Sequence, residues 1–154
     1  MRLGMEQSLS NVLIHVVFST KDRQHLIDKD IEPHLHSFMI SLSASLGSFM
    51  HKIGGTEDHV HLFLTLPRVL AMSDLLEQVK KNSSRWIKTQ GGKYSSFSWQ
   101  KGYGVFSVSM SNYTSIADYI ANQREHHKKY SFQDEFRKLL TLNNIPYDER
   151  YVWD

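Results

Sequence analysis

One stretch restricts the fold more than any other: residues 59–66 read His-Val-His-Leu-Phe-Leu-Thr-Leu. Side chains of a β-strand alternate between its two faces, so this pattern predicts a strand with one wholly apolar face. That face consists of Val60, Leu62, Leu64 and Leu66. His59 and His61 share the opposite face, where two imidazoles held side by side would form half of a metal site. The competing interpretation is a chance pair of packed histidines, because the chain has nine histidines in 154 residues.

Three further strands and four helices are predicted around this strand. Apolar runs predict strands at 11–19, 48–53 and 105–109. Gly54-Gly55 is expected to turn the chain into the histidine strand. Helical spacing of apolar residues, with capping residues before them, predicts helices. Their expected ranges are 28–46, 73–90, 112–128 and 132–140, with Ser73 as the cap of the second.

The order of these elements is β-α-β-β-α-β followed by helices, which is that of the ferredoxin-like split βαβ arrangement. The predicted fold class is therefore α+β, a sandwich built on a four-stranded antiparallel sheet with added C-terminal helices. Its first two helices should cover one face and leave the other face for a ligand. No repeat or long linker divides the chain, so a single domain is expected. Its parts are a core at 10–109, two helices within 112–143 and a tail at 144–154.

The composition excludes several classes of protein. The chain has no cysteine, which rules out disulfides and thiolate metal sites and fits a cytoplasmic protein. No apolar run approaches the ~18 residues of a membrane-spanning helix, and the N-terminus lacks the apolar core of a signal peptide. We therefore expect no membrane contact. The net charge of +2 is too small to indicate nucleic-acid binding unless the basic residues are clustered.

The third predicted helix places polar groups on its inward face. At about 100° per residue, Gln123 and His127 fall in line with the apolar Ile116. Polar groups on a buried face need partners, and a glutamine oxygen could bind a metal ion beside the two strand histidines. Tyr119, one turn before Gln123, would then place a phenol beside that ion. The alternative is a partly exposed Gln123 and an ordinary boundary tyrosine.

These two motifs together carry a family resemblance. His59-Val60-His61 resembles the His-hydrophobic-His signature of the HUH nucleases. Its combination with Tyr119-Ile120-Ala121-Asn122-Gln123 resembles the single-tyrosine transposases of the insertion-sequence 200-like family. The likeness extends from the segment at 15–21 through Trp99-Gln100-Lys101-Gly102-Tyr103. The stretch from 99 to 127 looks especially like the subgroup associated with repetitive extragenic palindromes.

The resemblance implies a function and a set of site residues. The Tyr119 hydroxyl would attack a DNA phosphate to give a 5′-phosphotyrosine link and a free 3′-hydroxyl, and the stored bond energy would allow rejoining without ATP. Mg²⁺ or Mn²⁺ would be held by His59, His61 and Gln123 and would polarise the phosphate. His127 and His15 are additional candidates for the site. Two imidazoles by themselves would favour zinc or another transition metal, so the ligand chemistry and the resemblance point to different ions.

The resemblance also implies partners. The substrate would be single-stranded DNA with hairpin, palindromic ends, and the protein would be a homodimer, with active sites that two subunits could share. A basic row on the second predicted helix, Lys81, Arg85 and Lys88, would contact DNA phosphates. A solvated helix face is the alternative interpretation of that row.

Two other functions compete with transposition. The first is a binding module for single-stranded nucleic acid with the same fold and no chemistry. The second is a zinc-dependent hydrolase that uses His59, His61 and His127. The DNA-cleaving tyrosine enzyme differs from both because it forms a covalent adduct between protein and DNA.

Overall fold

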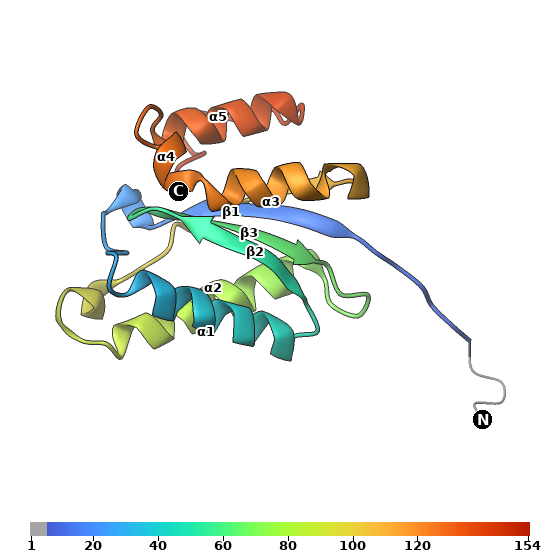
Figure 1. The fold of residues 1–154 in the computed structure, drawn as a ribbon. Coiled ribbons are helices and arrows are strands. Elements are labelled where there is room, and N and C mark those ends of the chain that lie inside the picture. The colour runs from blue at the N-terminus through green and yellow to red at the C-terminus, as the bar shows by residue number, and fades with distance from the viewer. Residues whose placement is uncertain (1–5) are drawn as a thin grey trace.

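Four antiparallel strands form one sheet in the computed structural model, which describes residues 6–154. The strands are β1 (Leu13–Ser19), β2 (Met50–Gly55), β3 (His59–Thr65) and β4 (Gly104–Val108). They lie in the order β2-β3-β1-β4 (Figure 1). This is the strand order of the split βαβ arrangement, so the predicted α+β class and antiparallel sheet are confirmed.

Two helices cover one face of the sheet, as predicted. They are α1 (Glu32–Ser45) and α2 (Met72–Lys88), which lie side by side beneath the strands in Figure 1. Val60, Leu62 and Leu64 point into this layer and are fully buried. The apolar face of the histidine strand therefore forms the main core.

Three helices cover the other face (Figure 1). They are α3 (Tyr113–Ala121), α4 (Gln123–His126) and α5 (Phe132–Leu142). Ile120 of α3 packs with Leu13 and Phe63, whereas apolar residues of α5 pack with Val17 and Phe106. The polar face of β3 lies between these two clusters. The second face of the sheet, which we expected to be open to a ligand, is thus covered by the C-terminal helices.

Three short 3-10 turns connect the elements, at Lys21–Arg23, Gly92–Ser96 and Met110–Asn112. Within residues 6–154, no helix has the length and apolar character needed to cross a membrane. The Asp28 carboxylate accepts the backbone N–H groups of Asp30 and Ile31 in the turn before α1, whose own N-cap residue is Ile31.

Three local expectations were wrong. Gly54 and Gly55 lie inside β2, and the chain turns at residues 56–58, where the Thr56 hydroxyl donates to Asp58. The N-cap residue of the second helix is Ala71, in extended backbone conformation, and not Ser73, which lies inside the helix. The helix expected at 112–128 breaks at Asn122 into α3 and α4, because Asn122 leaves helical backbone geometry (φ −99°, ψ 22°).

Candidate active site

Strand β3 places both histidines of the pair under the C-terminal helices. His59 and His61 have no exposed side-chain surface, and their rings lie 5.1 Å apart between centroids. Pairing with β1 sets His61 opposite Val17 and His59 opposite Ser19. The expected shared face is therefore present, and it lies deep in the protein.

Gln123 reaches the same place from α4. It is 1% exposed, and its Oε1 lies 3.0 Å from His59 Nε2. The break at Asn122 redirects the chain so that Gln123 points toward the sheet. The side-chain amide also donates to the backbone oxygen of Tyr119 at 3.4 Å, which directs Oε1 toward the histidine.

This donor set fits a cation. The Asp58 carboxylate lies 2.7 Å from Nδ1 of His59 and can accept a proton from it; in that tautomer Nε2 carries a lone pair. That lone pair faces a second acceptor, the oxygen of Gln123, at 3.0 Å. Two acceptors at this distance suit a metal ion between them. Nε2 of His59 and the oxygen of Gln123 could thus hold a cation between them, and His61 lies next to His59 on the same face of β3.

His15 supports the pair from the neighbouring strand. Its Nε2 lies 2.8 Å from Nδ1 of His61, and the two rings stack. Burial and the nearby His61 lower the pKa of His15 to about 3, so its ring is neutral. A neutral His15 can accept the Nδ1 proton of His61 and orient that ring. His15 would thus support His61 from behind if His61 binds a metal ion through Nε2.

Sequence reasoning missed Glu135, which lies at the centre of the cluster. This carboxylate of α5 is 3% exposed. One oxygen, Oε1, lies 2.9 Å from His61 Nε2 and 3.0 Å from His127 Nε2. The other, Oε2, accepts a hydrogen bond from the Tyr119 hydroxyl. Glu135 therefore joins the histidines to the tyrosine.

The electrostatics of the cluster follow from this arrangement. Burial raises the pKa of Glu135, but the charge of His61 and the hydrogen bonds of His127 and His61 outweigh it, so the pKa lies well below its usual range. Burial and the charge of Glu135 raise the pKa of Tyr119 above its ordinary value. Burial lowers the pKa of His127, but the hydrogen bond and charge of Glu135 have the larger effect, so the pKa is raised above its ordinary value. The site therefore holds an ionised carboxylate and a protonated phenol.

A family model described as "Transposase IS200 like" matches residues 8–123, which is most of the chain and includes both motifs. The chain belongs to the IS200-like transposase family. The transposases for insertion sequence IS200 from Salmonella typhimurium and Salmonella typhi are each 28% identical over 135 residues. Each match covers 82% of this chain and 88% of the relative.

Two solved structures share the fold of this transposase. One is a Deinococcus radiodurans protein assigned as a transposase, with a TM-score of 0.61 and 21% identity over 80% of this chain and 98% of the other. The second is a REP-associated tyrosine transposase bound to a REP hairpin. It has a TM-score of 0.59 and 16% identity over 82% of this chain and 74% of the other.

The basic row of this transposase lies apart from the histidine cluster. Lys81, Arg85 and Lys88 are exposed on α2, on the opposite side of the sheet from Tyr119. A groove of about 400 Å³ begins beside Lys81 and continues to Lys101 and Tyr103. The segment that carries Lys101 follows Trp99, which pairs with Thr20 immediately after β1. The groove therefore lies between α2 and the segment that follows Trp99.

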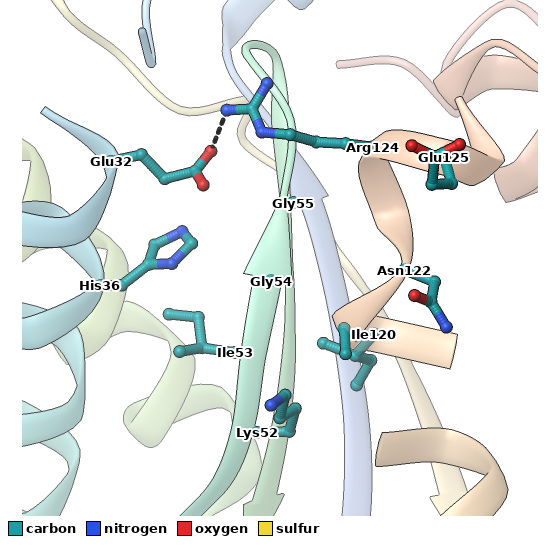
Figure 2. Close-up of a pocket in the computed structure, with 11 residues that line it drawn as sticks. Glu32, His36, Lys52, Ile53, Gly54, Gly55, Ile120, Asn122, Arg124 and Glu125 are labelled. Atoms are coloured by element: carbon teal, nitrogen blue, oxygen red, sulfur yellow. Dashed lines mark hydrogen bonds and ion pairs between the residues drawn. The ribbon is translucent and has the colours of Figure 1, made fainter. Parts of the chain in front are cut away.

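A second pocket lies along the free edge of β2. It has a volume of about 270 Å³ and lies between α1 and the junction of α3 with α4. Figure 2 shows Arg124 reaching across from α4 toward Glu32, with His36 below them on α1. Arg124 donates to Glu32 at 2.6 Å and to Glu57 at 2.8 Å. These ion pairs connect α4 to the start of α1 and to the turn before β3.

Proposed function

We propose that this transposase nicks and rejoins single-stranded DNA, with Tyr119 as the nucleophile. One observation carries the proposal: Glu135 contacts the Tyr119 hydroxyl with one oxygen and His61 Nε2 with the other. The carboxylate of Glu135 therefore lies between the phenol of Tyr119 and His61, one of the proposed metal ligands. Gln123, the other polar residue of the tyrosine motif, lies one turn after Tyr119 and contacts His59.

The chemistry assigns a task to each residue. As the bond between the Tyr119 oxygen and the phosphorus forms, the bond from phosphorus to the 3′-oxygen breaks, leaving a 5′-phosphotyrosine and a 3′ end that takes a proton from solvent. The phenol must lose its proton to solvent as it attacks, and Glu135 Oε2, which accepts the hydrogen bond of the hydroxyl, orients it. Attack by a 3′-hydroxyl reverses the step and rejoins a strand.

We propose His59, His61 and Gln123 as the residues that hold a divalent ion, Mg²⁺ or Mn²⁺, during cleavage. When bound, such an ion would polarise the scissile phosphate and offset charge that develops on it. The chain itself supplies the rest. Asp58 and His15 orient the two imidazoles, and the buried face excludes water that would hydrolyse the intermediate.

The experiment is cleavage of an end-labelled single-stranded DNA hairpin, followed by a denaturing gel that resolves the protein–DNA adduct. Tyr119→Phe should abolish both the nick and the adduct. Tyr113→Phe is the matched control, because the Tyr113 hydroxyl bonds to His51 at 2.8 Å and not to the histidine pair. An adduct formed by the Tyr119→Phe variant would assign the nucleophile elsewhere. Cleavage without any adduct would favour the zinc-dependent hydrolase, and binding without cleavage would favour the binding module.

We further propose hairpin DNA as the substrate and a homodimer as the working assembly. The structural relative bound to a REP hairpin supports the former, and the family resemblance supports the latter. In this chain Tyr119 reaches its own His61, since their rings lie 5.7 Å apart. A mixture of Tyr119→Phe and His61→Ala proteins should therefore stay inactive. Restored cleavage in the mixture would show that two subunits share each site.

A further inference from the structure

The pocket along the free edge of β2 has no task in the proposed chemistry, although it lies close to it. Asn122 and Arg124 line the pocket, whereas Gln123, between them in the chain, contacts His59 at 3.0 Å. β2 pairs with β3, so the pocket lies one strand away from the histidine pair. A DNA strand that reaches Tyr119 can therefore pass within reach of the pocket.

A buried nitrogen at this pocket lacks a partner. Within residues 6–154, Nε2 of His36 is buried and makes no hydrogen bond. Figure 2 shows this ring on α1, facing β2 below the ion pair of Arg124 and Glu32. Burial, and then the charge of Arg124, lower the pKa of His36 to about 4, so the ring is neutral at neutral pH and Nε2 can donate or accept one bond. A buried polar atom without a partner is costly, so a ligand that supplies one gains affinity.

The other lining groups suit a neutral, planar ligand. Glu32 and Arg124 form an ion pair at 2.6 Å, so neither charge is free to attract a phosphate. Arg124 uses only some of its five N–H donors in its bonds to the two glutamates. Ile53 and Ile120 supply apolar surface, and β2 is an edge strand whose outer backbone groups are not used by sheet pairing. A nucleobase has the matching form, with donors and acceptors along its edges and two apolar faces.

We propose that this pocket binds one unpaired nucleobase of the DNA strand that is cleaved, and that His36 contacts this base. The cavity of about 270 Å³ is slightly smaller than sites for drug-sized ligands, which suits a single base. Because Nε2 is buried, the ring must turn slightly to meet the base. Unstacked bases of single strands are commonly recognised by hydrogen bonds to their edges. The inference rests on the proposed function in that both require single-stranded DNA on this side of the molecule.

The test measures how far His36 and a single base depend on each other for binding. A fluorescent DNA hairpin with unpaired nucleotides on both sides is prepared as a series in which each unpaired nucleotide in turn lacks its base. Fluorescence anisotropy without added metal ion gives the Kd of each DNA for the parent protein and for His36→Ala. At one position, loss of the base should weaken binding to the parent about tenfold or more, but binding to His36→Ala by less than about threefold.

Two further variants make the comparison specific to the pocket. Ala121→Phe places a large side chain in the pocket wall and should behave as His36→Ala does, without removing a buried group. His34→Ala, at an exposed position of the same helix, is the matched control and should behave as the parent does. Urea unfolding checks that each variant is folded.

Equal factors for the parent and both pocket variants at every position would overturn the inference, and so would a series in which no position matters. Free nucleosides that shift the NMR signals of the His36 ring, without a coupled position in the DNA, would assign the pocket to a free nucleoside and overturn it as well. The result is separate from that of the cleavage assay. A coupled position without any protein–DNA adduct would keep the pocket and remove the proposed function, whereas an adduct without a coupled position would do the reverse.

Discussion

Gly54 of β2 lies directly against the carbonyl oxygen of Ile120, at the end of α3. A Cβ atom at this position would overlap that oxygen and approach the Ile120 side chain to 3.0 Å. Ile120 is the neighbour of Tyr119 and is fully buried. The absence of a side chain at Gly54 therefore lets the tyrosine helix rest on the edge of the sheet.

Gly54→Ala should displace the end of α3, because the clash involves backbone and cannot be relieved by a rotamer change. We expect a loss of about 1–3 kcal/mol in the free energy of unfolding and slower DNA cleavage. Lys52→Ala is the control, an exposed position in the same strand. Urea unfolding and the hairpin cleavage rate measure both effects. Equal behaviour of the two variants would mean that α3 does not depend on this contact.

Arg124→Ala should loosen the helix that carries Gln123. Arg124 is one-third exposed and pairs with Glu32 and Glu57, so the expected loss of stability is modest, about 1 kcal/mol. Hydrogen exchange should become faster for the amides of residues 120–127. Arg150→Ala serves as the control, since within residues 6–154 the ion pair of Arg150 is with Asp148, two residues away. Unchanged exchange in the Arg124 variant would show that packing alone holds α4.

Lys81→Ala combined with Arg85→Ala should weaken DNA binding and flatten its dependence on salt. Each lost phosphate contact reduces the slope of log K against log [salt] by about 0.7–0.9. The double variant Lys29→Ala with Arg150→Ala removes the same charge elsewhere on the surface. Fluorescence anisotropy with a labelled hairpin at several salt concentrations makes the comparison. A slope identical to that of the parent protein would leave the basic row as a solvated helix face.

His36 should make the fold sensitive to acid. Burial, and then the positive charge of Arg124, lower the pKa of His36 to about 4. Within the described residues, its Nε2 is buried and has no hydrogen-bond partner. The unfolded chain binds a proton near pH 6.5 and the folded chain only near pH 4. Stability is therefore complete above pH 6.5 and is lost as the pH falls between these values.

His36→Leu should remove this part of the acid sensitivity. Between pH 6.5 and pH 4, its free energy of unfolding should fall less steeply than that of the parent protein, by up to about 1.4 kcal/mol per pH unit. Urea unfolding at about pH 7.5, 6.0 and 5.0 provides the measurement. His34→Leu, at an exposed position of the same helix, is the control. Parallel curves for the parent and the His36 variant would contradict the assignment.

Most of the architecture could be predicted from local patterns. Alternation in residues 59–66 predicted a strand with one core face, and Val60 and Leu62 are fully buried as expected. The same alternation put both histidines on one side. Helical periodicity placed Gln123 inward, and it is 1% exposed. These features depend on the repeat of a strand or a helix, which sequence spacing records directly.

The position of Glu135 could also have been predicted from helical periodicity. On a helical wheel with Phe132 at zero, Phe136 falls near about +40°, Leu139 near −20° and Glu135 near −60°. Glu135 thus lies beside an apolar stripe, the same signal that drew attention to Gln123. A carboxylate on a buried face requires partners, and here they are His61, His127 and Tyr119.

The sequence by itself determined which residues share a face of a strand or helix, because backbone geometry repeats over a few residues. Only the tertiary structure decided which faces meet. The break at Asn122 turns Gln123 toward His59, and the bare backbone of Gly54 lets α3 approach β2. The packing of α5 over β1 and β4 brings Glu135 to His61, 74 positions earlier in the chain. Such contacts depend on the fit of whole elements, which no local repeat encodes.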